Sequence, residues 1–83
     1  MNPDQQAAAR EVLAEMQDWL HLSLRSYKGA VFLFALRLPP DKLIEALWVA
    51  EDRIPHGGLD GFKYFCGVCH RMIREIKGDL ARN

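Results

Sequence analysis

The sequence predicts an all-α protein, a compact bundle of about four helices. Apolar residues recur at spacings of three and four along most of the chain, proline and glycine divide it into segments of helical length, and no two segments look like paired strands. The 83 residues fit one domain, 1–83, because so short a chain cannot bury two separate cores. We expect helices at about 3–26, 29–38, 40–53 and 60–81.

The first predicted helix begins after Asn2, which is followed by proline at the first helical position. Gln5 stands where the partner of a capping box belongs. The apolar residues of this segment share one face of a helix: Val12, Leu13, Met16, Trp19, Leu20 and Leu24. Ser26 and Lys28 interrupt that spacing, so we end the helix near residue 26 and place a turn or a helix start at Gly29.

Residues 30–38 form an apolar run without a clear period, which is compatible with a buried strand or with a helix that is apolar all round. We favour the helix, because a lone strand would leave its backbone donors without partners. Such a helix would be the central one of the bundle, packed on several sides. The run is much too short for the roughly 20 residues that span a bilayer.

The third predicted helix begins at Pro40, since Pro39 and Pro40 cannot continue the preceding one. Asp41 then lies in its first turn, where an acid interacts favourably with the helix dipole. We expect Leu43, Ile44, Leu47, Trp48 and Ala50 to face inward, and Lys42, Glu45, Asp52 and Arg53 to face outward. A proline and two glycines in 54–58 end this helix.

The last predicted helix has the clearest amphipathic pattern in the chain. Asp60 is expected to cap its N-terminus, with Leu59 and Tyr64 at the spacing of a hydrophobic staple. Its apolar face contains Phe62, Phe65, Cys66, Cys69, Met72, Ile73, Ile76 and Leu80.

The segment from Cys66 to His70 has the C-x-x-C-H pattern of covalent haem attachment, and its two thiols would also suit a redox pair or half of a zinc site. We favour a buried structural role, because both sulfurs lie on the apolar face and free cysteine is among the most buried residue types. Haem attachment normally follows export, which this N-terminus does not suggest, and zinc would need scattered histidines. We predict no metal and no cofactor.

No catalytic motif is present in the sequence. Ser23 and Ser26 are the only serines, neither lies in a nucleophile elbow, and no glycine-rich phosphate loop follows a strand. We therefore predict that the protein is not an enzyme and has no small-molecule substrate. Without a signal peptide, a membrane span or a disulfide framework, we expect it to be cytoplasmic and to have no membrane partner.

The net charge is zero, but the charges are unevenly distributed. Residues 41–60 hold five acids against two bases, about −3, and 61–82 hold five bases against two acids, about +3. This polarity suits self-association or an anionic ligand. The candidate site is the basic stripe of the last helix with its neighbouring tyrosine, where cations would meet phosphates and the ring would stack on a base: Lys63, Tyr64, His70, Arg71, Arg74 and Lys77. The alternative is a solvated helix face, paired with the acidic third helix of the same or another chain.

The segments Leu43–Leu47 and Tyr64–Met72 resemble the C-terminal part of the DnaD-like replication domain. The family motif is a tyrosine, two aliphatic residues four and five positions later, and a tryptophan three further on. Tyr64, Val68, Cys69 and Met72 occupy those positions, with Cys69 replacing an aliphatic residue and Met72 the tryptophan. The resemblance implies a helical, oligomerising module that contacts DNA and replication proteins near Tyr64.

Together these features predict a small helical interaction module from a phage or mobile element. We expect it to form a homo-oligomer and to bind DNA or a replication or regulatory protein through its last helix. The alternative is a purely protein-binding adaptor or inhibitor without nucleic-acid contact.

Overall fold

The computed structural model describes residues 1–82, and the side chains of residues 1–78. This part of the chain folds into four α-helices and contains no strand: α1 (Pro3–Leu20), α2 (Leu24–Arg37), α3 (Pro40–Arg53) and α4 (Gly58–Arg82). The predicted all-α class and the predicted number of helices are confirmed.

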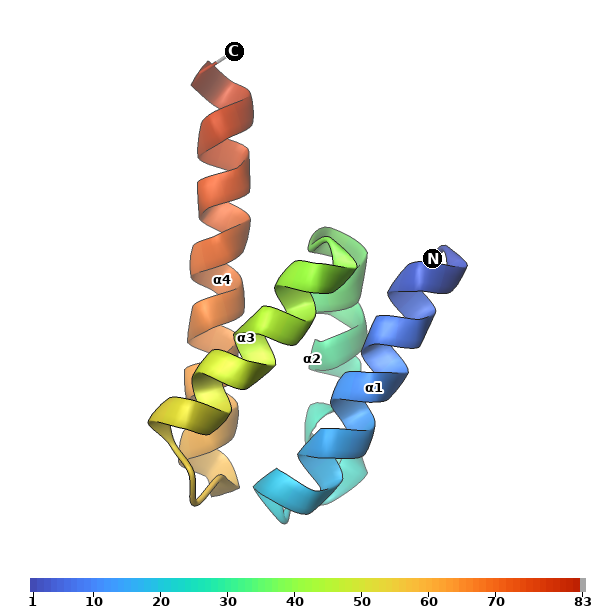
Figure 1. Cartoon of the computed structure of the whole chain (residues 1–83), viewed down its shortest axis with the longest axis vertical. Helices are drawn as coiled ribbons and strands as arrows, with labels where there is room; N and C mark the ends of the chain where they lie inside the picture. The colour runs from blue at the N-terminus through green and yellow to red at the C-terminus, as the bar shows by residue number, and fades with distance from the viewer. Residues whose placement is uncertain (83) are drawn as a thin grey trace.

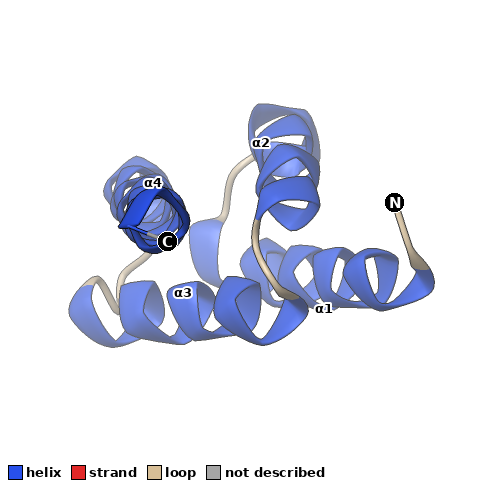
Figure 2. Ribbon diagram, turned by 90° about the horizontal axis from the view of Figure 1, so that it is seen from above, coloured by secondary structure: helices blue, strands red, loops and turns tan. Residues whose placement is uncertain are grey.

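The helices lie in two layers, with α1 and α3 in one and α2 and α4 in the other (Figure 2). The most extensive packing joins α3 to α4, and α1 to both α2 and α3. α4 is the longest helix, and its C-terminal part extends beyond the other three (Figure 1). One side of α4 faces α2, and another side packs on α3.

The start of α1 agrees with the predicted capping box. The Asn2 side-chain oxygen accepts a hydrogen bond from the Gln5 backbone N–H at 2.8 Å, and the Gln5 side chain accepts one from the Asn2 N–H at 3.0 Å. These two bonds satisfy donors that a helix N-terminus leaves without partners. The buried face of α1 consists of Ala8, Ala9, Val12, Met16, Trp19 and Leu20.

The predicted boundary between the first two helices is wrong. α1 ends at Leu20, because His21 adopts a left-handed conformation with φ of 57°, and α2 begins at Leu24 rather than at Gly29. Gly29 lies inside α2. The error arose because Leu24 continues the spacing of the α1 face across the break, although its side chain is exposed in the fold.

The helical interpretation of the apolar run is confirmed for residues 30–37, but its expected central position is wrong. α2 packs chiefly on α1 and only lightly on α3 and α4. Leu33 and Leu36 are consequently 56% and 52% exposed. Three neighbours that touch α2 unequally leave one of its apolar faces open to solvent.

α3 has the predicted bounds, but Trp48 does not face inward as predicted. The buried residues are Leu43, Ala46, Leu47 and Ala50, whereas Trp48 is 60% exposed. At about 100° per residue, Trp48 projects some 160° away from Ala50, on the solvent side of the helix.

α4 begins at Gly58, two residues before the predicted N-cap. Gly57 and Gly58 have φ of 67° and 63° and turn the chain directly into the helix. Asp60 therefore lies in the first turn, 3.8 Å from the His56 ring nitrogen Nε2, and does not cap the helix. The expected staple is wrong too, because Leu59 is exposed.

The apolar face of α4 packs into the core as predicted over the residues whose side chains are described. Phe65, Val68, Cys69 and Ile73 are buried, and Phe62, Cys66, Met72 and Ile76 pack against the core while partly exposed. The prediction for Leu80 lies outside the described side chains.

Candidate binding groove between α2 and α4

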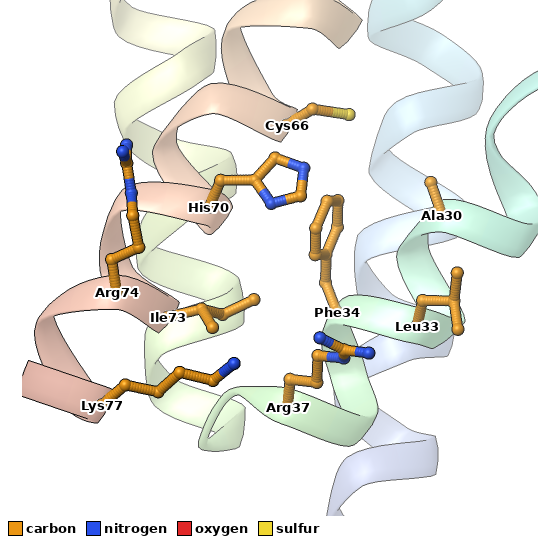
Figure 3. A pocket seen from close by; sticks show the side chains of 9 residues that line it. All are labelled: Ala30, Leu33, Phe34, Arg37, Cys66, His70, Ile73, Arg74 and Lys77. Atoms are coloured by element: carbon orange, nitrogen blue, oxygen red, sulfur yellow. The ribbon is translucent and has the colours of Figure 1, made fainter. Parts of the chain in front are cut away.

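A groove of about 750 Å³ runs between α2 and the middle of α4 (Figure 3). α2 contributes one wall and α4 the other, and α1 and α3 lie behind the groove in this view. Its lining consists of Ala30, Leu33, Phe34, Arg37, Cys66, His70, Ile73, Arg74 and Lys77.

The floor of the groove is apolar and is organised around one aromatic ring. The Phe34 ring meets the Phe65 ring edge-on, with centroids 5.9 Å apart, and the His70 ring edge-on at 5.1 Å. Edge-to-face contacts of this kind stabilise aromatic pairs beyond the area they bury. Because Phe34 itself is buried, it links the groove to the core and holds the His70 ring against the floor.

The rim of the groove is basic. Arg37 comes from α2, and His70, Arg74 and Lys77 come from α4; all four side chains are exposed. None of the nine lining residues is acidic, and within the described side chains none of the four makes an ion pair. Figure 3 shows Arg37 and Lys77 at the same end of the groove. The arrangement therefore offers cationic donors around an apolar surface.

The structure brings together only part of the predicted basic stripe. His70, Arg74 and Lys77 lie on the α2 side of α4, whereas Arg71 lines a separate hollow on the α3 side. Lys63 is exposed about two turns before His70 on the same line of the helix. Tyr64 is partly buried against the core, so its ring is less available for stacking than predicted.

The α2 half of the groove is not among the predicted site residues. Leu33, Phe34 and Arg37 lie some thirty to forty residues before their α4 neighbours in the sequence, and nothing local indicates that they share a surface with them. The one available signal is that Arg37 follows Phe34 and Leu33 at spacings of three and four, which predicts a mixed apolar and basic helix face.

The cysteines occupy the positions that the amphipathic pattern predicts. Both are free; Cys69 is fully buried, and Cys66 is partly buried and lines the groove. Burial raises the pKa of the Cys69 thiol to about 12, helped by the neighbouring Cys66, and burial also raises the pKa of Cys66. Such thiols stay protonated near neutral pH, whereas nucleophilic and metal-binding cysteines act as thiolates.

A second, acidic hollow lies between the end of α1 and the end of α3. Its lining consists of Glu15, Asp18, Trp19, His21, Glu51 and Pro55. The pKa of Glu51 is raised to about 7. Burial is the largest cause, and the hydrogen bond and the charge of Glu15 add to it. The charged form of Glu51 is therefore disfavoured where α3 packs against α1. Among the described residues, no group of three or more His, Cys, Asp or Glu side chains is arranged to hold a metal ion.

No protein-family model matches the chain, and no curated protein and no solved structure matches it either. The DnaD-like resemblance therefore stays a prediction. Within residues 1–82, no helix combines the length and the apolar character needed to cross a membrane.

Proposed function

We propose that this protein is an interaction module that binds an acidic, amphipathic helix of a protein partner in the groove between α2 and α4. The observation that carries this proposal is the combination of an apolar floor with a rim of four cationic or histidine side chains and no lining acid. Apolar grooves between helices commonly receive the apolar face of a third helix, and charges at the rim select the partner.

The apolar floor favours a protein partner over a nucleic acid. Leu33, Phe34 and Ile73 offer no hydrogen bond to a phosphate, whereas apolar side chains of a partner helix would be removed from water there. The exposed cations would then pair with carboxylates beside those apolar side chains.

DNA binding through α4 is the second candidate, and the exposed cations outside the groove favour it. Lys63 and Arg71 add to Arg74 and Lys77 a set of positive charges on both sides of the helix. Phosphate contacts do not require an apolar floor, and each one contributes to the salt dependence of binding. The DnaD-like resemblance supports the same partner class, DNA or a replication protein.

The two candidates predict different effects of substituting Arg71 and Arg74. We would titrate the protein into a fluorescein-labelled acidic amphipathic peptide and into labelled single- and double-stranded DNA across a salt series, following anisotropy. Arg74→Glu should weaken peptide binding by at least about tenfold, because it places a carboxylate in the rim. Arg71→Glu carries the same charge change outside the groove and should change peptide binding by less than about twofold.

DNA binding would respond differently to the same pair of variants. Both substitutions should weaken it, and each should reduce the slope of log K against log salt by about one, because each removes a phosphate contact. Peptide binding that is absent, or that is lost equally in both variants, contradicts the groove. DNA binding that is absent at low salt contradicts the second candidate.

A further inference from the structure

The solvent face of α3 carries a large apolar side chain that does not pack in the core. Trp48 is 60% exposed, the most exposed large apolar side chain of the described residues. Tryptophan is enriched at the centres of protein interfaces, where it contributes more to binding than most residues.

Acids flank this tryptophan along the same face of the helix. Asp41, Glu45, Trp48 and Asp52 follow one another at spacings of four, three and four, so their side chains share one line, and all four are exposed. We refer to these four residues as the α3 ridge. Glu45 pairs with Lys42 at 3.1 Å, which leaves the charges at the two ends, Asp41 and Asp52, uncompensated by any ion pair among the described side chains.

The α3 ridge matches the groove in both length and charge. From Asp41 to Asp52 the ridge covers twelve residues, and the α4 side of the groove from Cys66 to Lys77 covers twelve as well, about 16 Å in each case. The ridge presents one apolar side chain among acids, and the groove presents an apolar floor among cations. The rim has no lining acid to repel the ridge.

We propose that the groove of one molecule binds the α3 ridge of a second copy of this chain, with Trp48 on the apolar floor. This inference rests on the proposed function, since it names the acidic, amphipathic helix that the groove receives. The two surfaces belong to opposite layers: α3 lies in one, and the groove opens on the outer side of the α2–α4 layer (Figures 2 and 3). Contacts between unlike surfaces leave a free ridge and a free groove at the ends, so assembly continues beyond a dimer.

Sedimentation velocity over a concentration series tests this interface. At low salt, the weight-average mass of the whole chain should rise with concentration past that of a dimer, and it should fall again when salt is raised. Trp48→Ala should weaken association by at least about tenfold, since tryptophans at interface centres are frequent hot spots. Leu59→Ala removes a similarly exposed apolar side chain that belongs to neither surface, and it should leave the mass unchanged.

A mixing experiment tests whether the two surfaces are unlike. Trp48→Ala keeps an intact groove, and Arg74→Glu keeps an intact ridge, so each variant alone should be monomeric. Mixed together, they should form a one-to-one pair that does not grow, because one working ridge meets one working groove. If the interface instead joined two copies of the same surface, such as ridge to ridge, mixing the variants would not restore it. The absence of a pair in the mixture would therefore overturn the inference.

The remaining outcomes separate this inference from the proposed function. Two results would show that the α3 ridge does not bind in the groove. One is a chain that stays monomeric at all concentrations, and the other is a Trp48→Ala variant that associates like the unchanged protein. Binding of the acidic peptide to the same samples, with loss in Arg74→Glu, would then still support the groove. Circular dichroism of each variant should match that of the unchanged protein, since Trp48 and Arg74 are both exposed.

Discussion

At the scale of single residues, the two tryptophans have opposite roles. Trp19 is buried, and its ring N–H donates a hydrogen bond of 2.9 Å to the Ile54 carbonyl oxygen across 35 residues of chain. This is a direct polar bond between α1 and the segment that follows α3. Trp48, by contrast, leaves most of its ring in solvent.

Substituting each tryptophan by phenylalanine should expose this difference. Trp19→Phe removes the donor and leaves the Ile54 carbonyl without its partner, so we expect the free energy of unfolding to fall by about 1–3 kcal/mol. The matched variant Trp48→Phe should lie within about 0.5 kcal/mol of the unchanged protein, as surface substitutions usually do. Urea unfolding followed by circular dichroism measures both, and equal losses would contradict the assigned roles.

Tyr27 is a buried residue whose hydroxyl lacks a hydrogen-bond partner among the described protein atoms. Its side chain is almost completely buried in α2. A buried polar group without a partner costs free energy. Burial also raises the pKa of the Tyr27 hydroxyl above its ordinary value, because the phenolate would lose its hydration.

Tyr27→Phe should therefore stabilise the protein, by about 1 kcal/mol near neutral pH. The folded state holds the phenol proton more tightly than the unfolded chain, so the stabilisation from that proton is present below pH 10 and is lost as the pH rises above it. The variant should lack this part of the alkaline decline. Thermal unfolding at pH 7 and pH 11 measures both effects, and a less stable variant would show that the hydroxyl has a partner.

At the scale of elements, the α3–α4 connection depends on one glycine. Gly57 has φ of 67°, and a Cβ atom there would overlap the backbone carbonyl of Trp19. The left-handed conformation and the close approach of two backbones both require the absence of a side chain. Gly67, in the middle of α4, has open space where its Cβ would be.

Alanine substitutions at these two glycines should act in opposite directions. Gly57→Ala should destabilise the protein by more than about 2 kcal/mol, since both the backbone of Trp19 and the turn must shift. Gly67→Ala should stabilise it by about 0.5–1 kcal/mol, because alanine favours a helix interior over glycine. Thermal melts of the two variants provide the comparison, and a stable Gly57→Ala protein would refute the described turn.

The contact between α1 and α3 should make stability depend on pH. The pKa of Glu51 is raised to about 7, so the folded protein binds this proton more tightly than the unfolded chain does. Its contribution is complete at pH 4 and is lost as the pH rises through about 7. Glu51→Gln should leave the melting temperature unchanged at pH 4 and raise it at pH 8. A variant with the same pH profile as the unchanged protein would contradict the raised pKa of Glu51.

The sequence predicted an element well where periodicity and terminating residues agreed. Pro40 marked the start of α3, and the long apolar pattern of α4 predicted the face that packs into the core. The end of α1 was missed because its break depends on His21 in a left-handed conformation, for which no glycine or proline provides a signal. The burial of Trp48 was mispredicted because the smaller Ala46 completes the buried face of α3.

At the scale of the whole molecule, the layered packing creates the groove from two helices that are distant in sequence. The basic half on α4 was predicted from the sequence as a stripe, but the stripe divides between two sides of the helix. The apolar half depends on how α2 sits beside α4, which no local pattern specifies. A positive groove in one layer and an acidic ridge in the other explain how a chain of zero net charge offers two complementary surfaces.

The most direct test of the groove is a chemical-shift map of the ¹⁵N-labelled protein titrated with the acidic amphipathic peptide. We expect the largest amide shifts in residues 30–37 and 66–77, and no change in the amide shifts of α1. Shifts that centre on α1, or no shifts at all at saturating peptide, would contradict this expectation.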